Sequence, residues 1–194
     1  MEQPVMKKRG IYSVIVTMLV VWVTTFACLM YIERLQLGNK LQSRYQRELY
    51  DLIGNVQNLE SDLSKVRVTS SVQQTSLLFG DIWRQAGSAE DRINSLPISH
   101  SAISKTSKFL SQVSDFSYAL VKGVNNGKKL SDDDFKSLES LRNNAAYLRN
   151  VLIRLEGDIG EGKIMWSEIT SQGRRILGKA QTNIIDSKFA SVDK

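Results

Sequence analysis

Cysteine, histidine and proline are almost missing from this chain of 194 residues. The single cysteine is Cys28, the single histidine is His100, and the two prolines are Pro4 and Pro97. One cysteine excludes an internal disulfide framework, and one histidine excludes the usual metal sites with several histidines. A Ser-His-Asp triad would depend on His100 alone, which stands just before a predicted helix, a place typical of a loop or capping residue rather than of a catalyst. Strand-like alternation is also nearly absent, and the scarcity of proline leaves room for long uninterrupted helices.

Residues 11–32 form an uncharged and mostly apolar run. A helix of this length spans about 33 Å at 1.5 Å per residue, which is enough to cross a hydrocarbon core of roughly 30 Å. Lys7, Lys8 and Arg9 stand directly before the run, and this cationic cluster favours a cytoplasmic N-terminus. The pattern predicts a signal anchor, with residues 1–10 as a cytoplasmic tail.

Two other interpretations of this run are a cleaved signal peptide and a lipoprotein signal. Both are disfavoured because Leu29, Met30, Tyr31 and Ile32 continue the apolar run past the small Ala27. A lipoprotein site at Cys28 would also normally have a leucine where Thr25 stands. The run is therefore interpreted as a retained transmembrane helix.

The part outside the cytoplasm contains no cysteine, so apolar packing has to hold it together. The formal net charge of the whole chain is +6 and is spread along the sequence. Such a charge can attract anionic lipid or wall polymer weakly, whereas nucleic acid is not expected outside a membrane. No cofactor is indicated.

Apolar residues recur in alternating steps of three and four along four stretches of the chain, the pattern of helices that pack on one another. Arg44, Arg47, Asp62 and Lys65 lie off the first stripe. We predict an all-α protein in which the transmembrane helix is followed by an antiparallel four-helix bundle. The stripes are Tyr45, Leu49, Leu52, Val56, Leu59, Leu63 and Val66; Val72, Thr75, Phe79, Ile82, Ala86, Ala89, Ile93 and Leu96; Ala102, Thr106, Phe109, Val113, Phe116 and Leu120; and Leu138, Leu141, Ala145, Leu148, Leu152 and Leu155.

The stretches between the stripes have the composition of turns. Residues 68–71 are β-branched and hydroxyl-rich, Pro97 removes a backbone donor, and residues 122–129 contain two glycines and two asparagines. Ser131 is expected to cap the last helix, with three aspartates at its positive end. Gly157 is expected to end that helix.

Two groups of acidic residues resemble known kinds of chemical site. Glu139-Ser140 is similar to the Glu-Ser pair of some peptidoglycan-cleaving transglycosylases, but the Gly-Leu-Met-Gln segment that should accompany it is absent. Asp132-Asp133-Asp134 lacks the spaced ligands of a calcium loop, and helix capping accounts for it. These features favour a protein that is not an enzyme.

Four aromatic residues are the candidates for contact with a partner, namely Trp83, Phe116, Tyr118 and Trp166. Core filling is the alternative for each of them. Tryptophan and tyrosine are enriched at the centres of interfaces, where they act as anchors.

Several segments resemble the N-terminal region of the YpeB germination proteins of spore-forming Firmicutes. They are residues 82–86 (Ile-Trp-Arg-Gln-Ala), Leu96-Pro97, residues 109–118, Leu130-Ser131 before Asp134-Phe135, and the later Trp166. The stretch 109–118 is the most specific, and the likeness extends over nearly the whole chain. In that family a helical region precedes PepSY-type domains, so residues 33–172 are expected to form the exported bundle and residues 173–194 a linker towards domains missing here.

The resemblance also implies a function. Proteins of this family sit at the spore inner membrane and accompany SleB, a cortex-lytic transglycosylase, each being needed for the presence of the other. The expectation is a non-catalytic, single-pass protein on the cortex side of that membrane, which holds such an enzyme. Peptidoglycan and a second copy of the chain stay open as further partners. A receptor's sensory domain and a scaffold for cell division or wall synthesis are the alternative functions.

Overall fold

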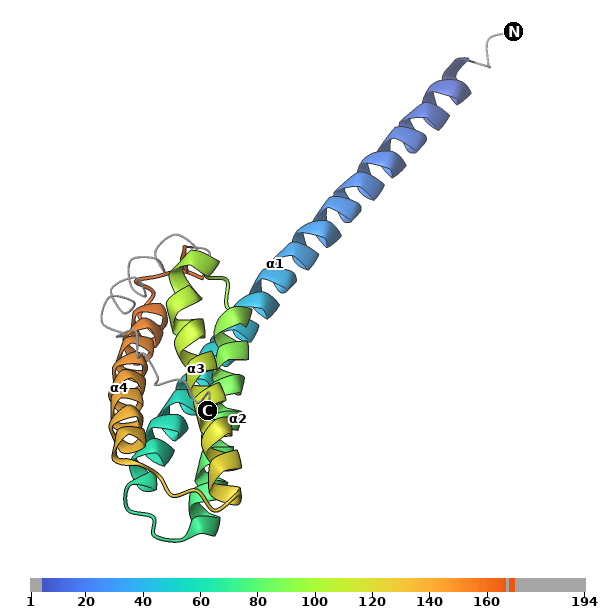
Figure 1. Ribbon diagram of the computed structural model, residues 1–194. Coiled ribbons are helices and arrows are strands. Elements are labelled where there is room, and N and C mark those ends of the chain that lie inside the picture. The colour runs from blue at the N-terminus through green and yellow to red at the C-terminus, as the bar shows by residue number, and fades with distance from the viewer. Residues whose placement is uncertain (1–4, 167, 170–194) are drawn as a thin grey trace. The chain divides into compact units, whose positions relative to one another are not determined.

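The computed structural model describes residues 5–166, 168 and 169, without the side chains of residues 5–13, 35, 37 and 39. The regular elements of this part of the chain are four helices (Figure 1): α1 (Val5–Val66), α2 (Val72–Ser95), α3 (His100–Asn125) and α4 (Asp132–Gly160). The prediction of an all-α fold is confirmed. The expected linker, residues 173–194, lies outside the described residues.

The chain divides into two compact units, residues 1–44 and residues 45–194, and the division falls within α1. In the first unit the stretch Val14–Arg34 is, by length and composition, a candidate membrane span. Its large apolar side chains are exposed, for example those of Val16 and Leu19. The hydroxyl of Thr24 donates to the carbonyl of Val20 at 2.9 Å, which satisfies a polar group that a bilayer could not.

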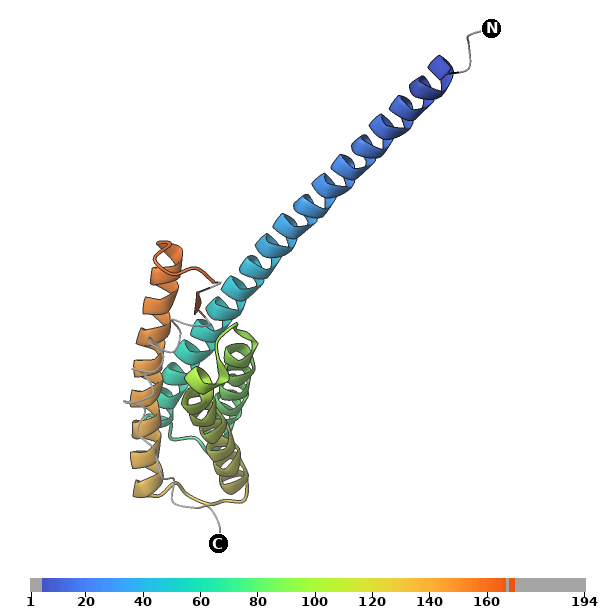
Figure 2. The same cartoon turned by 90° about the horizontal axis from the view of Figure 1, so that it is seen from above.

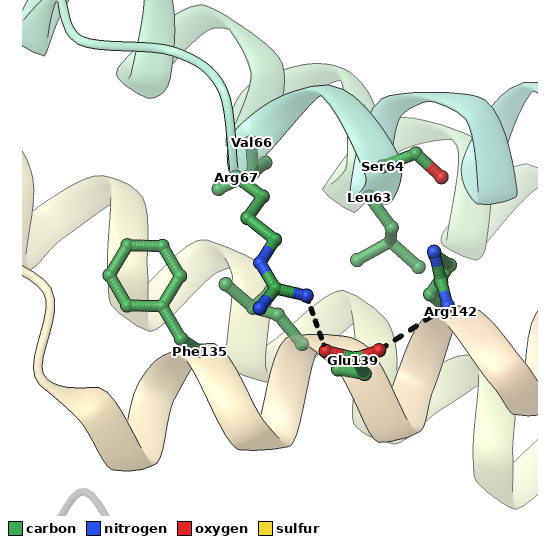
Figure 3. Close-up of a pocket in the computed structure, with 8 residues that line it drawn as sticks. Leu63, Ser64, Val66, Arg67, Phe135, Glu139 and Arg142 are labelled. Atoms are coloured by element: carbon green, nitrogen blue, oxygen red, sulfur yellow. Dashed lines mark hydrogen bonds and ion pairs between the residues drawn. The ribbon is translucent and has the colours of Figure 1, made fainter.

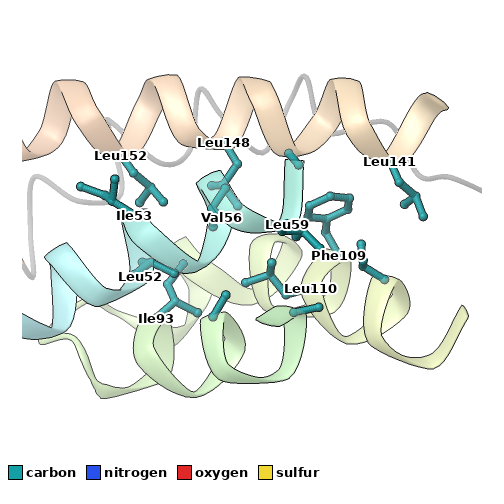
Figure 4. Close-up of a cluster of buried hydrophobic side chains, with 14 of the residues drawn as sticks. Leu52, Ile53, Val56, Leu59, Ile93, Phe109, Leu110, Leu141, Leu148 and Leu152 are labelled. Atoms are coloured by element: carbon teal, nitrogen blue, oxygen red, sulfur yellow. The ribbon is translucent and has the colours of Figure 1, made fainter. Parts of the chain in front are cut away.

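In the second unit, residues 45–66 of α1 join α2, α3 and α4, and successive helices run antiparallel (Figures 1 and 2). The predicted apolar stripes form the core of this bundle. Every stripe position is buried except Tyr45, which is half-buried, and Val72, which is exposed at the start of α2. Figure 4 shows Leu148 of α4 facing Val56 of α1 within the core.

Polar contacts on the outside of the bundle identify the neighbouring helices. Arg92 of α2 donates to Glu48 of α1 at 2.8 Å, and Arg149 of α4 donates to Glu60 of α1 at 2.5 Å. Both are ion pairs between partly exposed side chains, so each contributes little stability but favours one register of the helices. Helix α1 therefore lies beside both α2 and α4.

The N-terminus of α4 carries the cap that the sequence predicts. The Ser131 side chain accepts from the backbone N–H of Asp134 at 3.2 Å, and the Asp134 carboxylate accepts from the backbone N–H of Ser131 at 2.8 Å. This reciprocal arrangement is a capping box. It satisfies amides that the first turn of a helix leaves open, and it fixes where α4 begins.

The prediction that Gly157 ends the last helix is wrong. Helix α4 continues to Gly160, and the carbonyl of Gly157 accepts the backbone N–H of Glu161 at 2.9 Å. The physical reason is that Ile159 packs against the core, which favours one further helical turn. Gly162, with φ +70°, supplies the left-handed conformation at the chain reversal.

Asp62 lies off the first apolar stripe, as the sequence predicts, but its side chain is buried. Its carboxylate accepts from Gln85 of α2 at 3.0 Å and from Lys65 at 2.7 Å. These charge-assisted hydrogen bonds offset much of the cost of removing the carboxylate from water. A position beside the stripe is covered here because α2 packs over it.

Candidate partner-binding site

The structure divides the four candidate aromatic residues into two pairs. Trp83 is 47% exposed and Tyr118 is 55% exposed, whereas Phe116 and Trp166 are buried in the core. A buried ring cannot reach a partner without unfolding part of the bundle. Phe116 and Trp166 therefore have a packing role, and partner contact remains a hypothesis for Trp83 and Tyr118.

Trp83 and Tyr118 stand on different helices and pack against each other. Their ring centroids are 5.5 Å apart and the ring planes are inclined by 46°. The helices beneath them are also in contact, because the side-chain hydroxyl of Ser114 in α3 donates to the backbone carbonyl of Trp83 in α2 at 3.4 Å. The two rings form an exposed surface, named the aromatic pair below.

The heptad pattern explains why these two rings are exposed. Trp83 follows Ile82, which is fully buried, so it lies about 100° around the helix from the centre of the stripe. Tyr118 follows Ser117, which is fully buried, and lies two residues, about 200° around the helix, from the buried Phe116. The aromatic pair thus lies beside the core rather than in it, where α2 and α3 adjoin.

Trp166 packs instead against Tyr45, with ring centroids 5.6 Å apart. Ile164 and Ile169 of the same segment are buried as well. The chain after α4 therefore returns to the bundle and covers its core beside the first turn of the bundle part of α1. The indole nitrogen of Trp166 is buried and has no hydrogen-bond partner among the described residues.

Glu139, the residue considered as a catalytic acid, lies in a network of ion pairs (Figure 3). Its carboxylate accepts from Arg67 at 2.7 Å and from Arg142 at 3.4 Å. The cavity beside it measures about 30 Å³, room for roughly one or two waters but not for a sugar ring. The arrangement links α4 to the residue that follows α1.

No group of three or more acidic, histidine or cysteine side chains with metal-binding geometry occurs among the described residues. Asp134 is used by the capping box, and Asp133 pairs with Lys136 at 3.0 Å. His100 is the exposed first residue of α3, and Cys28 is exposed on α1.

Next to the aromatic pair lies a cavity that the sequence pattern does not predict. Tyr118 lines it together with Lys122, Lys128 and Lys129, at the place where α3 ends. The adjacent lysines at positions 128 and 129 were visible in the sequence, but their convergence with Lys122 depends on how the connection to α4 folds.

Comparison with known proteins identifies the family. Residues 33–168 match the family described as YpeB N-terminal. The sporulation protein YpeB of Bacillus subtilis strain 168 is 24% identical over 153 residues, which cover 79% of this chain and 34% of that protein. The sporulation protein YpeB of Oceanobacillus iheyensis is 22% identical over 164 residues, covering 84% of this chain and 36% of that protein.

A third relative, the sporulation protein YpeB of Halalkalibacterium halodurans, is 22% identical over 153 residues, covering 79% of this chain and 34% of that protein. The chain therefore spans about a third of the length of these curated relatives. No solved structure matches it. Because the family match covers most of the chain and includes the whole bundle, this protein belongs to the YpeB N-terminal family.

Proposed function

We propose that this chain is a non-catalytic, membrane-anchored germination protein that holds and stabilises a cortex-lytic enzyme of SleB type. Membership of a family whose members are called sporulation proteins supports a role in the spore. The candidate membrane span supports anchoring. The observation that carries the proposal is the aromatic pair, which presents two large rings on the outside of a packed bundle.

The aromatic pair has the physical properties of a binding anchor. Trp83 and Tyr118 already restrict each other's movement, so a partner that covers them loses little further side-chain entropy. Each ring offers apolar area together with a polar group at its edge, as anchor residues at interfaces commonly do. The bundle beneath them contributes rigidity and needs no reacting group.

The proposed orientation follows from the charges at the N-terminus, and the proposed membrane, the spore inner membrane, is what the resemblance to the YpeB family implies. Lys7, Lys8 and Arg9 favour a cytoplasmic location for residues 1–10. The residues after the anchor are therefore proposed to lie on the cortex side of that membrane. An enzyme that cleaves cortex glycan works on that side. The bundle is therefore proposed to retain the enzyme next to its substrate until germination.

Alanine substitutions at Trp83 and Tyr118 test this proposal, with Tyr50→Ala as the matched control. Tyr50 is also half-exposed, but it lies on α1 and bonds to Glu156 rather than to the aromatic pair. Loss of an aromatic anchor typically costs about 2 kcal/mol of binding, which is roughly thirtyfold in affinity. We expect Trp83→Ala and Tyr118→Ala to keep the helical circular dichroism and to lose enzyme from dormant spores.

The control separates binding from folding. Tyr50→Ala should retain the enzyme at the wild-type level. If the two variants of the aromatic pair stay folded and also retain the enzyme fully, the aromatic pair is not the binding surface. If both variants unfold the bundle, Trp83 and Tyr118 are structural residues and the site assignment is wrong.

A further inference from the structure

A cavity of about 480 Å³ lies where α3 ends and α4 begins. Its walls come from the last turns of α3, the connection over residues 126–130, and Asp134 of α4. Tyr118 belongs to both the cavity and the aromatic pair, so the two features form one continuous surface. The cavity is large enough to take one or two amino-acid side chains.

The rim of this cavity is positively charged. Lys122, Lys128 and Lys129 line it, all three are exposed, and none of them forms an ion pair among the residues that the structure describes. The acidic residue in the lining is Asp134, whose carboxylate accepts hydrogen bonds from the backbone and the hydroxyl of Ser131, at 2.8 and 2.7 Å. Its charge is engaged in the capping box, so the lysines are left to attract anions.

The inner wall of the cavity is apolar. Leu120 and Val124 line it and are buried, and Leu130 of the connection also lines it while packing against the core. An apolar wall with a cationic rim suits an aliphatic side chain flanked by carboxylates. A sugar would place hydroxyl groups against these hydrocarbon side chains without hydrogen-bond partners, which is costly.

We propose that this cavity binds an acidic segment of the partner protein, with an apolar side chain of that segment against Val124 and Leu130. Carboxylates on either side of it pair with Lys122, Lys128 and Lys129, and the neighbouring chain covers Tyr118. This inference rests on the proposed function, because it describes how the retained enzyme is held. It adds which groups the enzyme has to present, namely an apolar side chain flanked by carboxylates.

Zero-length cross-linking tests the contact directly. A water-soluble carbodiimide joins a lysine amine to a carboxylate only where the two groups touch, so cross-links identify true pairs. The full chain is solubilised from dormant spores together with the retained enzyme, cross-linked, digested and analysed by mass spectrometry. We expect Lys122, Lys128 or Lys129 to be joined to aspartate or glutamate of the enzyme. Cross-links from these lysines to a muramic acid carboxylate instead would overturn the proposal in favour of an anionic glycan.

A pair of charge reversals provides the quantitative test. Lys128→Glu/Lys129→Glu changes two exposed residues of the connection before α4, and Lys40→Glu/Lys105→Glu is the matched control. Lys40 and Lys105 are likewise exposed, show no ion pair among the described residues, and lie outside the cavity. We expect the cavity variant to retain at least about tenfold less enzyme, and the control to retain the wild-type amount.

The outcomes separate this inference from the proposed function. If the wild-type chain and the cavity variant retain the enzyme equally, the cavity inference is wrong and the proposed function stands. An equal loss in the cavity variant and the control would mean general charge attraction and would also overturn the inference. If the wild-type chain retains no enzyme, the proposed function itself fails.

Discussion

The ring of Trp166 packs on that of Tyr45, with centroids 5.6 Å apart, and so joins the segment after α4 to the first bundle residues of α1. Trp166→Ala should lower the free energy of unfolding by about 3 kcal/mol, since a large buried ring is removed. Trp166→Phe should cost clearly less, because it keeps a ring against Tyr45 and removes a buried indole N–H without a partner among the described residues. Thermal melts followed by circular dichroism of the detergent-solubilised chain measure both. Equal losses in the two variants would contradict this account.

The capping box at α4 provides a second prediction. Ser131→Ala should destabilise the bundle by about 1 kcal/mol, because the side-chain bond to the amide of Asp134 is lost. Ser71 occupies the equivalent position before α2 but makes no side-chain cap bond, so Ser71→Ala is the matched control. Urea denaturation should separate the two variants. A cost at Ser71 as large as that at Ser131 would show that the capping bond is not the cause.

A charged side chain placed in the apolar core should destabilise the bundle severely. Leu148→Asp or Leu52→Asp places an unpaired carboxylate at a fully buried position and should cost several kcal/mol, enough to unfold a marginally stable bundle. Glu139→Gln is the control, because Glu139 is partly exposed and only its ion pairs are lost. Circular dichroism should show loss of helix in the leucine variants alone. Loss of a glycan-cleaving activity in Glu139→Gln would revive the enzyme hypothesis.

The cationic residues that precede the apolar run predict the orientation of the chain in the membrane. With Lys7, Lys8 and Arg9 held inside, a protease added outside spheroplasts should digest the bundle and spare only a short N-terminal peptide. Immunoblotting with an antibody against the bundle reports the result. Protection of the whole bundle in intact spheroplasts, with digestion after lysis, would reverse the proposed orientation.

The core could be predicted from the sequence because one helical period determines burial over long stretches. The four stripes, the proline break and the Ser131 cap depend only on residues near one another in the chain. The helix end at Gly157 was predicted wrongly, and the burial of Asp62 was not predicted, because both depend on other parts of the fold. Helix α2 covers Asp62, and the packing of Ile159 extends α4 past Gly157.

The candidate site could be predicted only in part for the same reason. Trp83 and Tyr118 were recognised as possible anchors, but their contact depends on the register between α2 and α3. The heptad pattern separates them from Phe116, a stripe position that lies two residues from Tyr118 and is buried. The lysine-lined cavity requires the connection between α3 and α4 to bring Lys128 and Lys129 near Lys122.

The amount of cortex-lytic enzyme in dormant spores that lack this protein tests the central claim most directly. Spores of the source bacterium with the gene deleted, and spores with the gene restored, are compared by quantitative immunoblotting of the enzyme. The account predicts a large loss of the enzyme in the deletion strain and full recovery on restoration. A full complement of the enzyme in spores without the protein would contradict it.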